Sequence, residues 1–159
     1  MHPNVARVAD AARQAGLQIE VERFPDGTRT AADAARAVGC DVAQIVKSLV
    51  FMADDQPVLA LVSGANRVDL GRLADAVRAT EARRADGDEA RAATGFAIGG
   101  VPPFGHAERV TVVVDRDLTA HEWLWAAAGL PDAVFRLSPG DLVRVSGGTV
   151  ADLAEVAPG

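Results

Sequence analysis

The amino-acid sequence predicts one α/β domain of the mixed α+β class, in which helices pack on a mixed β-sheet. The chain has 159 residues, of which 49% are hydrophobic, so one core can form and we expect residues 1–159 to be a single domain. Helix-like and strand-like segments alternate, but irregularly. Two strand-like segments, 48–52 and 57–63, follow each other directly as a hairpin. The hairpin interrupts the strand–helix–strand order and therefore favours a mixed sheet over a purely parallel one.

Capping residues and apolar periodicity predict the helices. Thr30 with Asp33 is typical of a helix start and Gly39 of a helix end, which predicts a helix over 31–38. Asp41 and Gln44 have the spacing of a capping box, which predicts a further helical turn. The other expected helices are 4–15, a helix from 69 to 78 or 79, a short one ending near 94–95, one with a capping box at 119 and 122 that is stopped by Gly129, and a last turn over 141–143.

Short apolar segments bounded by turn residues predict the strands. Residues 17–21 alternate between apolar and polar, as in a half-buried strand, and Asp26-Gly27 is a turn signal. The remaining expected strands are Ser48–Met52, Pro57–Ser63, 110–115 and 133–137, with 150–156 as a final strand or helix.

Composition excludes several classes of protein. No apolar stretch approaches the roughly 20 residues of a membrane span, and the first residues lack the apolar centre of a secretion signal. Cys40 is the only cysteine, so no internal disulfide can form. We therefore expect a cytoplasmic protein. The net charge of −6 argues against a general nucleic-acid binder, but it leaves room for a small basic patch that handles one RNA end.

The motifs of several common enzyme classes are absent from the sequence. His2, His106 and His121 are far apart and have no cysteine at ligand spacing, so we expect no metal and no cofactor. The sequence contains no G-x-S-x-G, no G-x-x-x-x-G-K-[ST] and no G-x-G-x-x-G. These absences argue against an esterase-type serine nucleophile and against the common nucleotide-binding loops.

One lysine and one glycine-rich loop are the main candidates for a site. Of 16 basic residues, 15 are arginine and only Lys47 is lysine, so Lys47 marks a place where a compact ammonium is needed, or a snorkelling lysine at a strand edge. The segment Gly99–His106 holds three glycines and two prolines. Such a loop is either a tight connection or a rigid, open segment whose backbone N–H groups can bind a developing oxyanion.

Other candidates have a simpler interpretation that is more common. Cys40 is expected to be a small core residue rather than a nucleophile. Arg83 and Arg84 are expected to be solvated, with contact to RNA phosphate as the alternative. His106, beside the glycine loop, is expected to be structural, with proton transfer as the alternative.

Three segments resemble the YbaK/ProX family of transfer-RNA editing domains, also called the prolyl-tRNA synthetase insertion-domain superfamily. These segments are TRTAADAARAVGCDVAQIVKSLVF (28–51), LVSGANRVDL (61–70) and TGFAIGGVPPFGH (94–106). The resemblance extends from about 28 to 143 and implies a mixed sheet, curved toward a barrel, with helices around it. It also implies hydrolysis of the ester that joins a wrong amino acid to tRNA, most often tRNA-Pro carrying alanine, cysteine or 2-aminobutyrate.

The resemblance also implies the residues of the site. Lys47 and Gly100 are assigned to catalysis, with backbone N–H groups of Gly99, Gly100 and Val101 on the substrate carbonyl. The other implied substrate-binding residues are Pro102, Pro103, Phe104, Gly105, His106, Thr30, Ser48, Ser63 and Gly64. The implied partners are the acceptor end of aminoacylated tRNA and prolyl-tRNA synthetase, with neither DNA nor membrane. Two alternatives are a non-catalytic module that binds an amino acid or nucleotide, and a regulatory partner of a synthetase.

Overall fold

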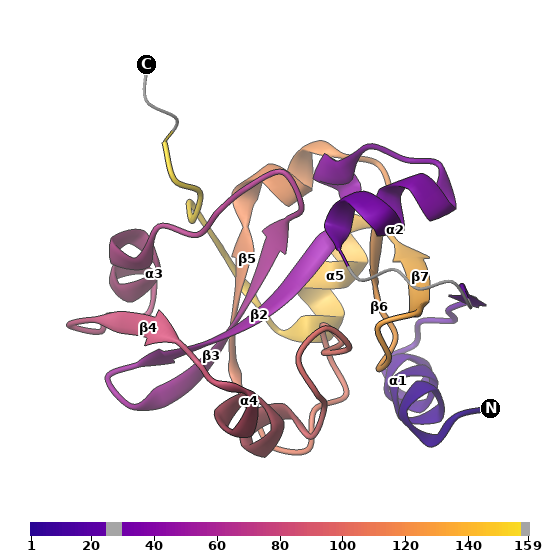
Figure 1. Ribbon diagram of the computed structural model, residues 1–159, viewed down its shortest axis with the longest axis horizontal. Helices are drawn as coiled ribbons and strands as arrows, with labels where there is room; N and C mark the ends of the chain where they lie inside the picture. Colours follow the sequence, from indigo (N-terminus) through magenta and orange to yellow (C-terminus); the bar gives the residue numbers. More distant parts are fainter. Residues whose placement is uncertain (25–29, 157–159) are drawn as a thin grey trace.

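Two β-sheets and five α-helices form the fold in the computed structural model, which describes residues 1–24 and 30–156 (Figure 1). The helices are α1 (Pro3–Gln14), α2 (Ala31–Val38), α3 (Leu70–Ala76), α4 (Gly87–Thr94) and α5 (Pro139–Ser146), with 3₁₀ helices η1 (Val42–Gln44) and η2 (Arg116–Ala120). The strands are β1 (Val21–Arg23), β2 (Val46–Ala53), β3 (Gln56–Ser63), β4 (Ala82–Arg84), β5 (Thr111–Asp115), β6 (Leu124–Ala127), β7 (Ala133–Leu137) and β8 (Thr149–Ala151).

The larger sheet has five strands in the order β4-β2-β3-β5-β8. Strands β2 and β3 form the predicted hairpin, and its turn residues Asp54 and Asp55 have φ of 47° and 66°. Such positive φ values at both central residues match the twist of a tight hairpin. Strand β3 pairs with β5 in parallel, and β5 with β8 in parallel, whereas β2 pairs antiparallel with β3 and β4. The predicted mixed sheet is therefore confirmed.

The smaller sheet is antiparallel, in the order β1-β7-β6. Within the described residues, an isolated bridge between Ile45 and Trp125 links the start of β2 to β6. The strands thus form two separate sheets, so the expected curvature into a barrel is not confirmed.

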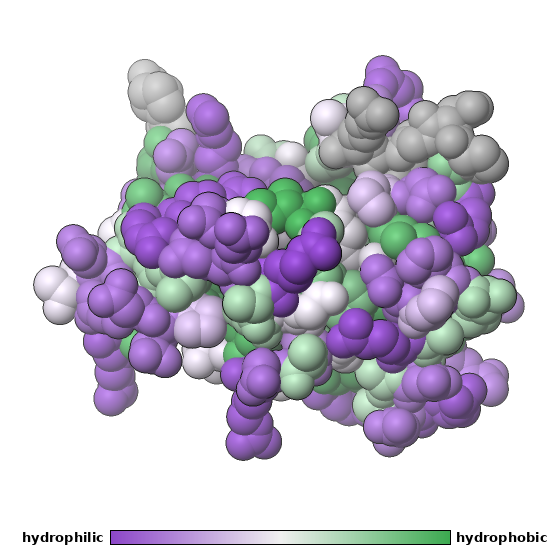
Figure 2. All heavy atoms as spheres, turned by 60° about the horizontal axis from the view of Figure 1, so that its bottom comes forward, coloured by the Kyte–Doolittle hydropathy of each residue, from purple (hydrophilic) through white to green (hydrophobic). Residues whose placement is uncertain are grey.

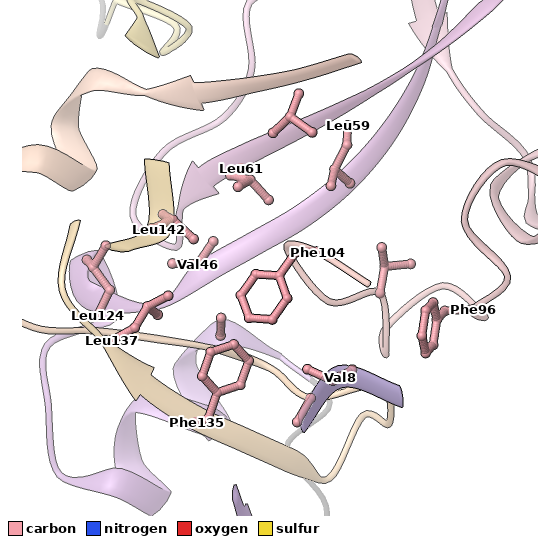
Figure 3. Packing of buried hydrophobic residues seen from close by; sticks show 14 of the residues in the cluster. Val8, Val46, Leu59, Leu61, Phe96, Phe104, Leu124, Phe135, Leu137 and Leu142 are labelled. Atoms are coloured by element: carbon pink, nitrogen blue, oxygen red, sulfur yellow. The ribbon is translucent and has the colours of Figure 1, made fainter. Parts of the chain in front are cut away.

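The core has two main parts, one on each face of the β2–β3 hairpin. The larger cluster lies between the hairpin, α1 and the small sheet, and Figure 3 shows Phe104 and Phe135 at its centre. The second cluster packs Phe51 and Val62 against Leu73 of α3. Because both faces of β3 are covered, its sequence is continuously apolar rather than alternating. On the surface seen in Figure 2, hydrophilic residues dominate and apolar ones form small patches.

Most predicted elements are confirmed, but the helix predicted over 119–129 is wrong. This segment contains η2 and then β6, not a helix. Strand β6 pairs with β7 and buries Leu124 and Ala126 on alternate positions, so tertiary pairing overrides the local capping signal.

Smaller differences concern the chain ends and one edge strand. The short edge strand β4 was not expected, and of residues 17–21 only Val21 belongs to a strand. Segment 150–156, expected as a strand or helix, contributes to strand β8. The predicted turn at Asp26-Gly27 lies outside the described residues. None of the helices in the described part of the chain is long and apolar enough to cross a membrane.

Candidate active site

A cavity of about 300 Å³ lies where α2, the start of β2, β4 and the β6–β7 hairpin meet. Its walls are mostly small or branched apolar side chains, and its polar side chains are Thr30, Lys47, Ser48 and Arg84. The lining residues that close it include Ala31, Ala34, Val38, Ile45, Val46, Leu49, Val50, Ala85, Ala90, Ile98, Gly99, Val101, Trp125, Ala126, Ala127, Pro131 and Val134. A small apolar cavity with a few polar groups is typical of a ligand site.

Helix α2 forms one wall because its ends are fixed by local capping. The Thr30 hydroxyl oxygen accepts a hydrogen bond from the Asp33 N–H at 3.0 Å, and Gly39 ends the helix in the left-handed conformation with φ of 77°. The buried face of the helix packs Ala34 on Ile45, just before β2. The predicted residue Thr30 therefore reaches the cavity, with its hydroxyl already accepting one hydrogen bond.

Lys47 projects from β2 into the cavity and is partly buried. Its Nζ donates to the backbone carbonyl of Asn66 at 2.5 Å. Burial lowers the pKa of Lys47, and the nearby charges of Arg84 and Arg67 lower it further, whereas Asp115 raises it. The ammonium is thus anchored at one point while the rest of it faces a site of excess positive charge.

Ser48 contributes a buried hydroxyl to the cavity. Its Oγ has no hydrogen-bond partner among the residues that the structure describes. A buried hydroxyl without a partner costs about 1–3 kcal/mol, which a polar atom of a ligand would recover. Ser48, which was predicted to bind substrate, therefore remains a candidate ligand contact.

The glycine loop reaches the cavity at Gly99 and Val101. Gly99 has φ of 95°, which favours glycine. The Gly100 N–H donates to the Ala97 carbonyl at 3.0 Å, and a Cβ on Gly100 would lie 3.0 Å from the Gly129 carbonyl oxygen. Gly100 is therefore needed for close packing, and its N–H, which was assigned to the substrate carbonyl, already has an acceptor.

The second half of this loop lies away from the cavity. Pro102 and Pro103 are buried, and Phe104 is 4% exposed with its ring 5.6 Å from that of Phe135 (Figure 3). A ring nitrogen of His106, Nε2, is 2.7 Å from the Pro102 carbonyl oxygen, and burial lowers the pKa of His106. Instead of lining the cavity, these residues fix the loop to the core. Gly105 packs in the same way on α1, where a Cβ would lie 3.2 Å from that of Ala11.

Ser63 and Gly64, also predicted as site residues, brace η1 instead. The Ser63 hydroxyl donates to the Ala43 carbonyl at 2.8 Å. A Cβ on Gly64 would lie 2.4 Å from the Val42 carbonyl oxygen, so only glycine fits there. Neither residue lines the cavity.

Arg84 and Trp125 line the cavity but were not predicted as site residues. The Arg84 guanidinium lies over the Phe51 ring, 5.6 Å from its centroid. Arg84 was expected to be solvated, with contact to RNA phosphate as the alternative, and it is exposed. Trp125 was placed on the wrongly predicted helix. In residues 1–24 and 30–156, no three His, Cys, Asp or Glu side chains are grouped so as to hold a metal ion.

The structure is a mixed α/β domain with a small cavity, which is lined by one ammonium and by part of a glycine loop. The sequence model of the aminoacyl-tRNA editing domain matches residues 25–145, and the chain belongs to this family. Family membership supports an aminoacyl-tRNA deacylase role, which is a hydrolase activity.

Individual relatives include both free-standing and much longer proteins. The chain is 30% identical over 128 residues to the uncharacterized protein YwhH of Bacillus subtilis, covering 80% of this chain and 81% of YwhH. It is 34% identical over 137 residues to the proline–tRNA ligase of Solidesulfovibrio magneticus, covering 84% of this chain but 23% of the ligase.

One solved structure is similar to this chain over nearly the whole length of both proteins. It is the crystal structure of a proposed trans-editing enzyme for prolyl tRNA synthetase, with a TM-score of 0.92 and 45% identity. The match covers 98% of this chain and 99% of that one.

Proposed function

We propose that this protein hydrolyses the ester between a small wrong amino acid and the terminal adenosine of tRNA-Pro. The observation that carries the proposal is that Lys47 and the loop residues Gly99 and Val101 meet at one small apolar cavity. Editing of this kind is needed because a synthetase pocket gains only about 1–3 kcal/mol of discrimination per methylene group. The similarity to a proposed trans-editing enzyme for prolyl tRNA synthetase supports this choice of tRNA.

The cavity residues supply charge stabilisation rather than a nucleophile. No residue that the structure describes accepts a hydrogen bond from the N–H of Gly99 or Val101, so both groups can donate to the substrate carbonyl. A water molecule attacks the carbonyl carbon, the ester C–O bond breaks, and the ribose hydroxyl regains a proton. The Lys47 ammonium stabilises the negative charge on the carbonyl oxygen or on the terminal phosphate. An aminoacyl ester is already activated, so no covalent enzyme intermediate is required.

The walls of the cavity suit a small amino acid such as alanine, cysteine or 2-aminobutyrate. Ala34, Ala126 and Val134 line it, and the Ser48 hydroxyl, which has no partner among the residues that the structure describes, offers one polar contact. Proline-charged tRNA is the product that must be spared.

Deacylation assays test the proposal directly. Purified tRNA-Pro is charged separately with alanine, cysteine, 2-aminobutyrate and proline, and release of each amino acid is measured against a buffer blank. We expect rapid release of at least one wrong amino acid and no release of proline above background. If folded protein releases none of them, the assignment to tRNA-Pro is wrong. Retained affinity for a free amino acid or nucleotide would then favour a binding module.

Arg84 is expected to bind a phosphate of the acceptor end, because it lines the cavity of an otherwise acidic protein. Replacing it by glutamine should raise KM for mischarged tRNA about 2- to 5-fold. The slope of log KM against log salt concentration should fall by about 1, because one phosphate contact is lost. Arg72→Gln, an exposed change on α3 away from the cavity, is the matched control. Equal KM and equal salt dependence in wild type and Arg84→Gln would contradict this contact.

A further inference from the structure

Asp115 is a buried carboxylate at the carboxyl end of β5, beside the end of β3. It is 1% exposed and does not line the cavity. One of its oxygens, Oδ2, accepts from the Ser63 N–H at 3.1 Å and from the Asn66 side-chain amide at 2.9 Å, and Oδ1 accepts from the Asp117 N–H at 3.0 Å. Strands β3 and β5 are parallel, so the loop that follows β3 passes directly over this carboxylate.

Asn66 is the residue through which this carboxylate reaches the site. Its side-chain amide donates to Asp115 and also to Asp117 at 2.8 Å, and its backbone N–H donates to the Ser63 carbonyl at 2.9 Å. The backbone carbonyl of the same residue accepts the hydrogen bond from Lys47 Nζ. The position of the Lys47 ammonium therefore depends on the Asn66 carbonyl. Asn66 in turn is held in place by the hydrogen bond from its side-chain amide to Asp115.

We propose that Asp115 is a positioning residue for Lys47, acting through Asn66 to hold the ammonium at the cavity. Its importance for turnover rests on the proposed function, whereas its effect on Lys47 does not. If Asp115 did not hold Asn66, the carbonyl that accepts from Lys47 would move, and the flexible lysine side chain would sample several rotamers at the cavity. A displacement of about 1 Å at a reacting centre can cost about 100-fold in rate.

Asp115 also supplies negative charge at a site with excess positive charge. The charged groups that act on Lys47 are Arg84 from β4, Arg67 from the loop after β3, and Asp115 from β5. Asp117, at η2, contacts Asn66 on the same side. Burial, Arg84 and Arg67 lower the pKa of Lys47, and Asp115 opposes them. Removing the Asp115 charge should therefore make the ammonium lose its proton at a lower pH.

The chain offers an unusually direct measurement, because Lys47 is its only lysine. Protein labelled with [ε-¹³C]lysine gives one side-chain signal, whose pH titration reports the pKa of Lys47 without any substrate. In Asp115→Asn we expect this pKa to fall, because the carboxylate charge is gone. In Asn66→Ala the Asp115 charge remains, and the side-chain hydrogen bonds from residue 66 to Asp115 and Asp117 are lost, so the backbone carbonyl that accepts from Lys47 is held less firmly. We therefore expect a smaller change in pKa but a changed lysine chemical shift. Asp152→Asn removes an exposed carboxylate that pairs with Arg116 and is the matched control.

Deacylation kinetics provide the second measurement. We expect kcat to fall about 10- to 100-fold in Asp115→Asn and about 10-fold in Asn66→Ala, with wild-type kcat in the control. The alkaline limb of the pH–rate profile should move to lower pH in Asp115→Asn. In Asn66→Ala the same limb should move by a much smaller amount. A purely structural role for Asp115 would lower the melting temperature without moving this limb.

The outcomes separate the two proposals. An unchanged Lys47 titration in folded Asp115→Asn would overturn the positioning role, whatever the activity. If Asp115→Asn does not fold, an unchanged lysine signal and wild-type kcat in Asn66→Ala would overturn it instead. If wild-type protein lacks deacylase activity, the proposed function fails while the lysine titration still decides the role of Asp115.

Discussion

Replacing Lys47 with alanine is expected to lower kcat/KM for deacylation of mischarged tRNA-Pro by at least about 100-fold. The ammonium is the one lysine charge at the cavity, and removing one preorganised group that stabilises developing charge typically costs about 100- to 1,000-fold. Release of the labelled amino acid under single-turnover conditions measures the effect. Lys47 is only partly buried, so Lys47→Ala should keep the wild-type circular dichroism and nearly its melting temperature.

Lys47→Arg is the informative companion variant. The Nζ–O distance to Asn66 is 2.5 Å, and a planar guanidinium is larger than the ammonium that fits this position. We therefore expect arginine to restore little of the activity, although it restores the charge. If folded Lys47→Ala turns over as fast as wild type, Lys47 has no role in the reaction, and the glycine loop would have to act without it.

Local signals were sufficient for the elements whose ends are set by capping. Thr30 and Gly39 bound α2 as predicted, and the hairpin of β2 and β3 was found because a polar turn separates two apolar segments. The same signals failed at 119–129, where a capping pattern precedes a strand. Pairing of β6 with the next strand, β7, decides that segment, and this tertiary pairing overrides the capping pattern.

Local sequence signals also identified part of the candidate site, but not all of it. Lys47 and the glycine loop stand out in the sequence, and the structure places Lys47, Gly99 and Val101 around one cavity. The sequence does not tell which way each loop residue points. Phe104 was itself predicted to contact the substrate, but its large apolar ring is buried in the core, where it is more stable than at a wetted cavity. Arg84 reaches the cavity only because the unpredicted strand β4 pairs with β2.

Replacing Phe104 with alanine is expected to lower the free energy of unfolding by about 3–5 kcal/mol, because it deletes a buried ring from the centre of the larger cluster. Phe104 is 4% exposed and its ring contacts that of Phe135, so the loss includes burial and one aromatic pair. For a chain of this length the melting temperature should fall by roughly 6–20 °C. Urea denaturation followed by circular dichroism measures the change directly.

Ile98→Ala provides the matched control, since Ile98 lines the cavity mouth and is 52% exposed. This change should leave the unfolding free energy within about 0.5 kcal/mol of wild type. Its effect should instead be on which amino acids are released from tRNA. If Phe104→Ala kept wild-type stability and altered the choice of amino acid, Phe104 would belong to the cavity wall. The contrast between Ile98, which precedes the glycine loop, and Phe104, six positions further on, therefore tests whether the segment 98–106 changes from substrate contact at its start to anchoring in the core at its end.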